Sequence, residues 1–242
     1  MQESANYQEL AKRYGLAPLP ESVSQLTQLI ARQDAEMDQI AALISKDPGL
    51  KARILRVANP RAEHESEYTI ETVEDALMRN GIGCVLLIAM GTPLAQALVK
   101  AFQTMLSLKL DTINVHDAPE LSGEHILGTI GFSGKALGRV YLRMSLDSGK
   151  KIAGTILGLD ASELNDFLEV KDVIGEVLNI MTGNFKSNLC DAGLDCRLET
   201  PDVKLTDDRQ TPTIRGGGLE RMAFRSGDIV LFVDVTVNPW ND

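Results

Sequence analysis

Residues 172–201 read DVIGEVLNIMTGNFKSNLCDAGLDCRLETP, and apolar side chains recur with helical spacing through the first half of this stretch. At about 100° per residue, one side of the predicted helix is apolar, with Val173, Ile174, Val177, Leu178, Met181 and Phe185. The opposite side is a narrow polar stripe made of Asp172, Glu176, Asn179, Gly183 and Lys186. The apolar side must pack against another element, so we expect the polar stripe to face outward.

The residues of the polar stripe are unusual choices for a solvated helix surface. Such surfaces normally carry long side chains with high helix propensity, whereas Asn179 is a weak helix former. Asn179 lies between Gly175 and Gly183, and each glycine costs about 1 kcal/mol relative to alanine inside a helix. These costs indicate a surface that is kept bare for contact with another molecule.

The composition restricts the class of partner. The chain has 242 residues, of which 44% are hydrophobic and 24% charged, enough for two modest domains. Its formal net charge is −10 and its pI is about 4.9. An acidic chain is poorly suited to neutralising nucleic-acid phosphates or to docking on an anionic membrane. We therefore expect a protein partner or a small ligand.

The three cysteines indicate a reducing compartment. Cys84, Cys190 and Cys196 are odd in number and lack the spacing of a metal site, so they are interpreted as small core residues. The sequence opens without a positively charged leader, and its most apolar run, residues 82–90, is too short to span a bilayer. These features predict a cytoplasmic protein without a transmembrane helix.

The N-terminal part is predicted to be all helical. Apolar spacing and cap residues predict helices at 5–14, 21–33, 36–45, 48–58, 69–81 and 82–90, with a charged loop at 61–68. Asp47 and Thr69 are the predicted N-caps of two of these helices, and Gly81 is expected to separate the last two. Gly91-Thr92-Pro93 is expected to end this part, so the predicted domains are 1–91 and 92–242.

This helical part resembles an HDOD domain. The resemblance rests on Leu19-Pro20, on IAALISKDPGLKARILRVAN at 40–59 and on IETVEDALMRNG at 70–81, and it covers about residues 16–90. A full HDOD domain continues for about as many residues again, so the resemblance implies a partial domain with a regulatory or interaction role. HDOD domains are relatives of metal-dependent phosphohydrolases without the metal ligands, and His64 has no His-Asp pair.

From residue 92 onward the pattern mixes helices with strands. A helix is predicted from Thr92-Pro93 to about Met105, then a strand at 108–115 and a hairpin of HILGTIGFSG and LGRVYLRMSL with its turn near 133–135. Helices at 148–157 and 161–167 precede the one in 172–189, and strands DCRLETPDVKL, MAFRSG and DIVLFVDVTV follow it. This order predicts an α+β domain whose mainly antiparallel sheet carries long helices on one face.

The second part resembles the chemotaxis phosphatase families CheC and CheX. Their signature is an Asp or Ser, a Glu, an Asn and a proline rather more than twenty residues later, here Asp172, Glu176, Asn179 and Pro201. The resemblance extends to a strand bounded by glycines at 128–134, to GRVYLRM, to KKIAGTILG and to MTGNFKSNL. A single Glu-x-x-Asn site with these flanks favours the CheX type over the two-site CheC type.

This resemblance implies a phosphatase that hydrolyses the phosphoaspartate of a CheY-like response regulator. Asn179 would orient the attacking water, and Glu176 would pair with the lysine of the regulator's active site. Asp172 and Pro201 would shape the site, and Gly183 would support it. No cofactor is expected in the chain itself, because Mg²⁺ would come with the regulator. CheX-like proteins commonly dimerise through sheet edges, so a homodimer is also expected.

Three further candidates stay open. Arg215-Gly216-Gly217-Gly218 fits a phosphate cradle, but it does not open a helix after a strand, so a flexible hairpin loop is favoured. Lys186 is either a contact for an acidic regulator surface or a solvated side chain. His64, His116 and His125 are scattered in the sequence, which argues against a metal site.

Two other functions are compatible with the same residues. In the first, the polar stripe binds a regulator or another signalling protein without catalysis, and the chain is an adaptor. In the second, the helical part senses a ligand, although no residue in it points to one. Taken by itself, Glu-x-x-Asn offers neither a nucleophile nor a base with its orienting partner, so it can only position other groups.

Overall fold

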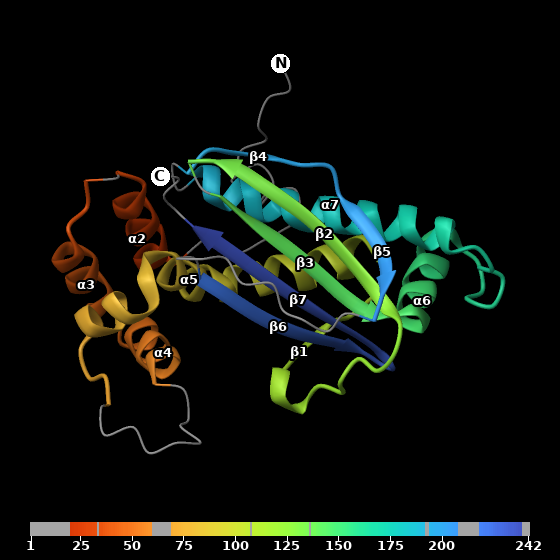
Figure 1. Ribbon diagram of the computed structural model, residues 1–242, viewed down its shortest axis with the longest axis horizontal. Helices are drawn as coiled ribbons and strands as arrows, with labels where there is room; N and C mark the ends of the chain where they lie inside the picture. Colours follow the sequence, from red (N-terminus) through yellow and green to blue (C-terminus); the bar gives the residue numbers. More distant parts are fainter. Residues whose placement is uncertain are drawn as a thin grey trace.

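The computed structural model describes residues 20–32, 34–59, 69–106, 108–135, 137–191, 194–207 and 218–238. A helical module consists of α2 (Glu21–Ala31), α3 (Met37–Ser45) and α4 (Pro48–Ala58). It lies at one end of an antiparallel sheet, and the long helix α5 (Val73–Leu106) runs from the module along the sheet (Figure 1). The helices predicted for α2, α3 and α4 are confirmed, whereas the one at 5–14 lies outside the described residues.

Side-chain caps set the ends of the module's helices. The Asp47 carboxylate accepts a hydrogen bond from the Leu50 backbone N–H at 3.0 Å, which confirms the predicted cap of α4. The predicted cap Thr69 is wrong, because the Thr72 hydroxyl accepts from the Asp75 backbone N–H at 3.1 Å and α5 begins at Val73. Thr72 also donates to the Asp75 side chain, and this reciprocal pair fixes the first turn.

Helix α5 runs through the position of the predicted domain boundary. Gly81 has φ 75° and ψ 160°, so the predicted break there is confirmed as a kink. The predicted helix end at Gly91 and restart at Thr92-Pro93 are wrong, since the helix continues to Leu106. An interior proline costs about 3 kcal/mol, but every residue from 82 to 91 is buried, and that packing keeps the helix continuous. The division at residue 91 therefore falls inside a helix, and the two domains stay a prediction.

The sheet has seven strands within the described residues, and all of its pairs are antiparallel, which confirms the predicted fold class. Its order is β1-β6-β7-β3-β2, with β4 and β5 both pairing with β2 at the far edge. The strands are β1 (Asp111–Ile113), β2 (His125–Gly134), β3 (Leu137–Ser145), β4 (Cys196–Leu198), β5 (Asp202–Thr206), β6 (Gly218–Ser226) and β7 (Ile229–Asn238). The predicted strand at 108–115 shortens to β1 and is followed by a 3₁₀ turn, η1 (Val115–Asp117).

The helices cover one face of this sheet. The later part of α5, α6 (Leu146–Leu157) and α7 (Phe167–Asp191) pack on it, and the rings of Phe132 and Phe185 meet edge to face at 5.5 Å. Helix α6 starts two residues earlier than predicted because the Ser145 hydroxyl caps it. The short helix predicted at 161–167 is wrong, since residues 161–163 form a turn before α7. No helix in the described ranges is long and apolar enough to cross a membrane.

The module and the sheet meet at a half-buried carboxylate. Arg53 of α4 donates to the backbone carbonyl of Ile88 and lies 4.0 Å from Glu220 of β6. Gly91 leaves the room that this carboxylate occupies, because a Cβ there would lie 2.0 Å from Glu220 Oε1. Burial raises the pKa of Glu220 to about 7, against the smaller opposing effect of Arg53. The junction is therefore sensitive to whether this carboxyl is ionised.

We expect Glu220→Gln to stabilise the protein at pH 8 but not at pH 5. The folded pKa of about 7 exceeds the ordinary value of 4.5, so the carboxyl favours folding below pH 4.5 and loses this contribution as the pH rises through 7. The neutral amide avoids that loss, which amounts to about 2–3 kcal/mol. Urea unfolding of the wild type and the variant at pH 5 and pH 8 measures this effect. If the two proteins differ in free energy of unfolding by the same amount at both pH values, the interpretation is contradicted.

Candidate active site

Helix α7 begins with a side-chain cap and is longer than predicted. The Asp166 carboxylate accepts a hydrogen bond from the Leu168 backbone N–H at 2.9 Å, which satisfies one donor of the first turn. The helix then runs for 25 residues to Asp191. The stretch that starts at Asp172 is thus preceded by a full helical turn, and its polar stripe lies in the helix interior.

The apolar side of α7 packs on the sheet as predicted. Ile174, Val177, Leu178, Met181 and Phe185 are buried, and Val173 is half-buried. The approach to β2 is close, since a Cβ at Gly128 would lie 3.2 Å from Leu178 Cδ2 and 3.7 Å from Val203 Cγ2. The first distance is tighter than ordinary packing and the second is ordinary contact, so a side chain at this position would push Leu178 away from the strand. This contact fixes α7 both along its axis and around it.

The polar stripe lies on the opposite side of α7. Asp172, Glu176 and Asn179 are exposed, and Gly183 and Lys186 are half-buried. Fourteen residue steps at 1.5 Å each make the stripe about 21 Å long. A Cβ at Gly183 would meet nothing within 4 Å, so the glycine is not required by packing inside the chain. The structure therefore brings all five predicted residues of the stripe to one helix face.

Pro201 lies on the neighbouring edge strand. β4 pairs with residues 132–134 of β2 and β5 with residues 125–129, and the segment between them contains one extra residue. This β-bulge includes Pro201, which has no N–H to donate to the ladder. β5 then passes beside α7, because Val203 Cγ2 lies 3.9 Å from the Cβ position of Gly175. Pro201 thus follows the edge that borders the polar stripe, and its role in shaping the site stays a prediction.

The far end of the stripe holds two thiols. Cys84 and Cys196 are buried and Cys190 is half-buried, which fits the predicted core role for the first two. A hydrogen bond from Cys196 lowers the pKa of Cys190 to about 6, with a smaller contribution from the Lys186 ammonium, and the pKa of Cys196 is raised. The Lys186 ammonium thus lies near the Cys190 thiol at the end of α7.

The stripe can position groups but cannot do chemistry alone. Glu176 and Asn179 are one turn apart, about 4.5 Å along the axis, and both side chains are open to solvent. An exposed amide can hold a water molecule, and an exposed carboxylate can pair with a cation brought by a partner. In the part of the chain that the structure describes, no group of three or more His, Cys, Asp or Glu could hold a metal ion.

The structure also gathers residues that the sequence interpretation missed. His116 and His125 line one pocket together with Arg143 and Arg221, on the sheet face that α7 does not cover. Alternation along the strand GRVYLRM puts Arg143 on the side of the strand away from the apolar residues. Only the order of the strands in the sheet brings it near Arg221. His64 and residues 215–217 of the candidate phosphate cradle lie outside the described residues, and Gly218 begins β6.

Comparison with protein families finds two matches. Residues 16–113 match the HDOD domain, and residues 126–216 match the chemotaxis phosphatase CheX. Both resemblances drawn from the sequence are thereby confirmed, and the first extends beyond residue 90 to the end of β1. No curated protein matches the chain.

Solved structures share the fold of the sheet and its helices. The chemotaxis protein CheX from Vibrio vulnificus is 25% identical, with 60% of this chain and 97% of that chain covered and a TM-score of 0.52. A CheC-like superfamily protein from Shewanella sp. PV-4 is 22% identical, with coverage of 62% and 97% and a TM-score of 0.52. A CheX-CheY-BeF3-Mg²⁺ complex from Borrelia burgdorferi matches at 17% identity, with coverage of 61% and 96% and a TM-score of 0.50.

We expect Gly183→Ala to raise the free energy of unfolding by about 1 kcal/mol, because alanine is the better helix former and its methyl group meets open space. Gly128→Ala is the matched control, and it should destabilise the protein because its Cβ crowds Leu178. Urea unfolding of the two variants measures both effects. A loss of stability in Gly183→Ala would show that packing within the chain, and not contact with a partner, requires the glycine.

Proposed function

We propose that the polar stripe of α7 is the catalytic face of a phosphatase that hydrolyses the phosphoaspartate of a CheY-like response regulator. The observation that carries the proposal is the exposure of Glu176 and Asn179, one turn apart, on a helix whose other side is locked to the sheet. The match of residues 126–216 to the chemotaxis phosphatase CheX covers this helix. The four signature residues also lie on α7 and on the edge that borders it.

Asn179 supplies the water-positioning group. Its amide donates to one phosphoryl oxygen, and its carbonyl oxygen accepts a hydrogen bond from the attacking water, as the glutamine of GTPases does. The bond from phosphorus to the water oxygen forms as the bond to the aspartate oxygen breaks. The aspartate leaves as a carboxylate, and the protons of the water pass to the phosphate and the solvent. Because the stripe contributes no nucleophile, orientation is the main contribution of Asn179.

Glu176 holds the partner in place. Its exposed carboxylate would pair with the lysine of the regulator's active site, and this pairing fixes the regulator relative to Asn179. In this proposal the Mg²⁺ and the acyl phosphate both come with the regulator. The solved CheX-CheY-BeF3-Mg²⁺ complex from Borrelia burgdorferi has a protein of the same fold together with a CheY protein.

The remaining predicted residues have supporting roles. Asp172 and Pro201 border the catalytic pair along α7 and the edge strand, and Gly183 keeps the surface low where a partner would approach. Lys186 extends the stripe toward an acidic surface of the regulator. A homodimer joined through sheet edges belongs to the proposal as well, and sedimentation of the purified protein tests it. The helical module, residues 1–91 in the predicted division, would direct the phosphatase to its site of action.

We expect Asn179→Ala to lower stimulated phosphate release from a phosphorylated regulator by about 10²–10³-fold, which is typical for the loss of one group that stabilises a transition state. Asn179→Asp should be similarly impaired, because a carboxylate cannot donate to the phosphoryl oxygen. Asn114→Ala replaces an exposed asparagine on another element and should keep full activity. Phosphate release from the regulators of the same organism is the measurement, and wild-type rates in both Asn179 variants would refute catalysis by this face.

The alternative is an adaptor that uses the same face without catalysis. It is favoured by the exposure of the stripe alone, which suits any docking partner. An adaptor would bind phosphorylated and unphosphorylated regulator with different affinities and leave the regulator's own dephosphorylation rate unchanged. Measuring binding and phosphate release on the same samples separates the two functions.

A further inference from the structure

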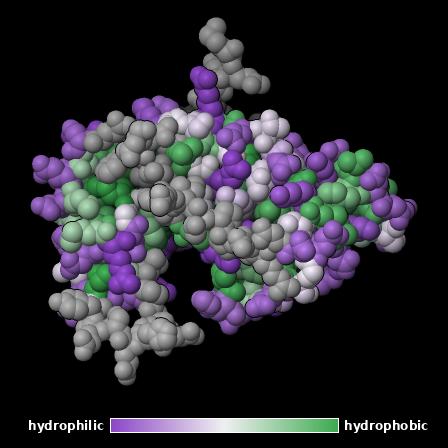
Figure 2. Space-filling view, viewed as in Figure 1, coloured by the Kyte–Doolittle hydropathy of each residue, from purple (hydrophilic) through white to green (hydrophobic). Residues whose placement is uncertain are grey.

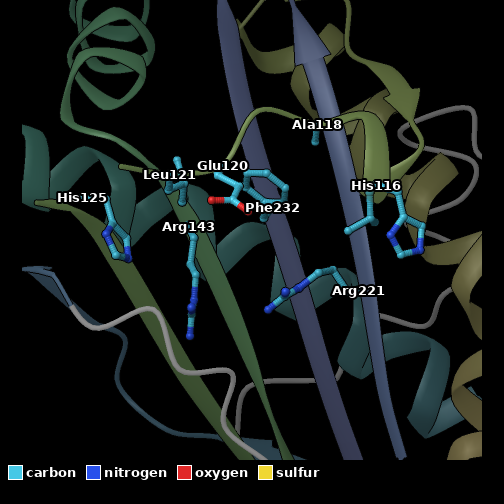
Figure 3. Close-up of a pocket in the computed structure, with 9 residues that line it drawn as sticks. His116, Ala118, Glu120, Leu121, His125, Arg143, Arg221 and Phe232 are labelled. Carbon is cyan, nitrogen blue, oxygen red and sulfur yellow. The ribbon is translucent and has the colours of Figure 1, made fainter. Parts of the chain in front are cut away.

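A pocket lies on the sheet face opposite α7. Its volume is about 490 Å³, within the range of about 300–1,000 Å³ typical of small-molecule sites. Strands β2, β3, β6 and β7 form its floor, and the segment around η1 forms its rim. Figure 3 shows that Arg143 and Arg221 come from different strands and lie on either side of the strand that carries Phe232.

Arg221 is held in a defined orientation in this floor. Its Nε and Nη2 donate to the two carboxylate oxygens of Asp234 at 2.6 and 2.7 Å, and Asp234 is 1% exposed. A bidentate pair of this kind immobilises a guanidinium, which keeps its charge at any physiological pH. Part of the Arg221 side chain stays accessible, 36% by area, so the group is available at the pocket surface.

Arg143 and Phe232 complete the floor. They are direct partners in the β3–β7 register, and Arg143 is 5% exposed. A guanidinium kept this far from bulk solvent interacts more strongly with an anion than one on an open surface. Phe232 presents an aromatic ring next to it, and Leu121 adds an apolar side chain at the rim (Figure 3). The floor therefore combines positive charge with a flat apolar surface.

His125 provides the observation that points to a ligand. Its Nδ1 lies 3.1 Å from the Gly123 carbonyl oxygen, so that nitrogen carries the proton and donates. The other ring nitrogen, Nε2, is buried and has no hydrogen-bond partner among the described residues. A buried polar atom without a partner costs about 1–3 kcal/mol. Because Nε2 is the acceptor in this tautomer, a hydroxyl of the ligand, such as that of a singly protonated phosphate, would donate to it and remove that cost.

We propose that this pocket binds a small organic anion, a phosphate or carboxylate group joined to a flat apolar ring. The anionic group lies between Arg143 and Arg221, within reach of His125, and the ring lies against Phe232. The site is separate from the polar stripe, because the sheet stands between them, and it does not depend on the phosphatase proposal. Glu120, an exposed carboxylate at the rim, opposes the anion and limits its affinity.

The test uses phenyl phosphate and benzoate as probes on the full chain. Titrations followed by ¹H–¹⁵N spectra of the arginine side chains should show shifts at Arg143 and Arg221 with both probes. Benzyl alcohol, which has the ring without the charge, should not produce them. Which of the two anions binds more tightly identifies the anionic group. The proposal is overturned if neither probe saturates the protein at concentrations up to tens of millimolar, or if benzyl alcohol produces equal shifts.

A variant in the pocket and a control outside it assign the binding to this pocket. Arg143→Gln should raise the dissociation constant of either anionic probe at least about tenfold, because it removes a charged donor. Arg139→Gln is the control, since Arg139 lies on the same strand and the same face but outside the pocket. Equal weakening by both arginine variants would overturn the assignment.

Glu120→Gln keeps the test valid even if Arg143→Gln fails to fold. Glu120 is exposed, so its replacement should leave the fold intact. Removing its negative charge should tighten binding of either anion about threefold, because like charges repel across a partly solvated site. Weaker binding of the anions in this variant would mean that Glu120 does not oppose the bound group, and that result contradicts the proposal.

Discussion

The close contact between α7 and β2 holds the rest of the molecule in position. A Cβ at Gly128 would lie only 3.2 Å from Leu178 Cδ2, so a side chain there would displace Leu178, and Val203 of the edge strand meets the same place. With the apolar side of α7 fixed in this way, the polar side has a single orientation. The proposed catalytic face has only two positioning groups and would need this rigidity, because a displacement of about 1 Å can cost about 10² in rate.

Helix α5 makes the module and the sheet a single body. It begins in the helical module, bends at Gly81 and then lies buried along β6 and β7, and the core is continuous from the module to the sheet. Glu220 lies half-buried at the junction, and Arg53 of α4 lies 4.0 Å from it. Figure 2 shows polar side chains over much of the molecule's surface, with apolar groups gathered beside α6. Rearrangement of the module would therefore act on the sheet directly through α5.

The two faces of the sheet have different chemistry because strand residues alternate. Val140, Leu142 and Met144 of β3 face the helices, while Tyr141 and Arg143 between them face the other way. Tyr141 is 7% exposed, and this burial raises the pKa of its phenol. One strand thus supports the helix of the proposed catalytic face on one side and the proposed anion pocket on the other.

The sequence alone determined the features that depend on near neighbours. Helical spacing in 172–189 predicted both sides of α7, alternation predicted the β2–β3 hairpin, and Asp47 and Gly81 correctly marked a helix start and a kink. Each of these depends on a cap, a backbone angle or a period within a few residues. The polar stripe, with Glu176 and Asn179, therefore follows from helical periodicity alone.

Only the tertiary structure decided the rest. Pro93 was expected to start a helix, yet burial of residues 82–91 carries α5 through it, because packing energy exceeds the local cost of a proline. The bulge at Pro201 and the meeting of Arg143 with Arg221 both follow from strand pairing between segments far apart in the chain. Local periodicity contains no information on register or strand order, so a site built from several strands appears only when the sheet is assembled.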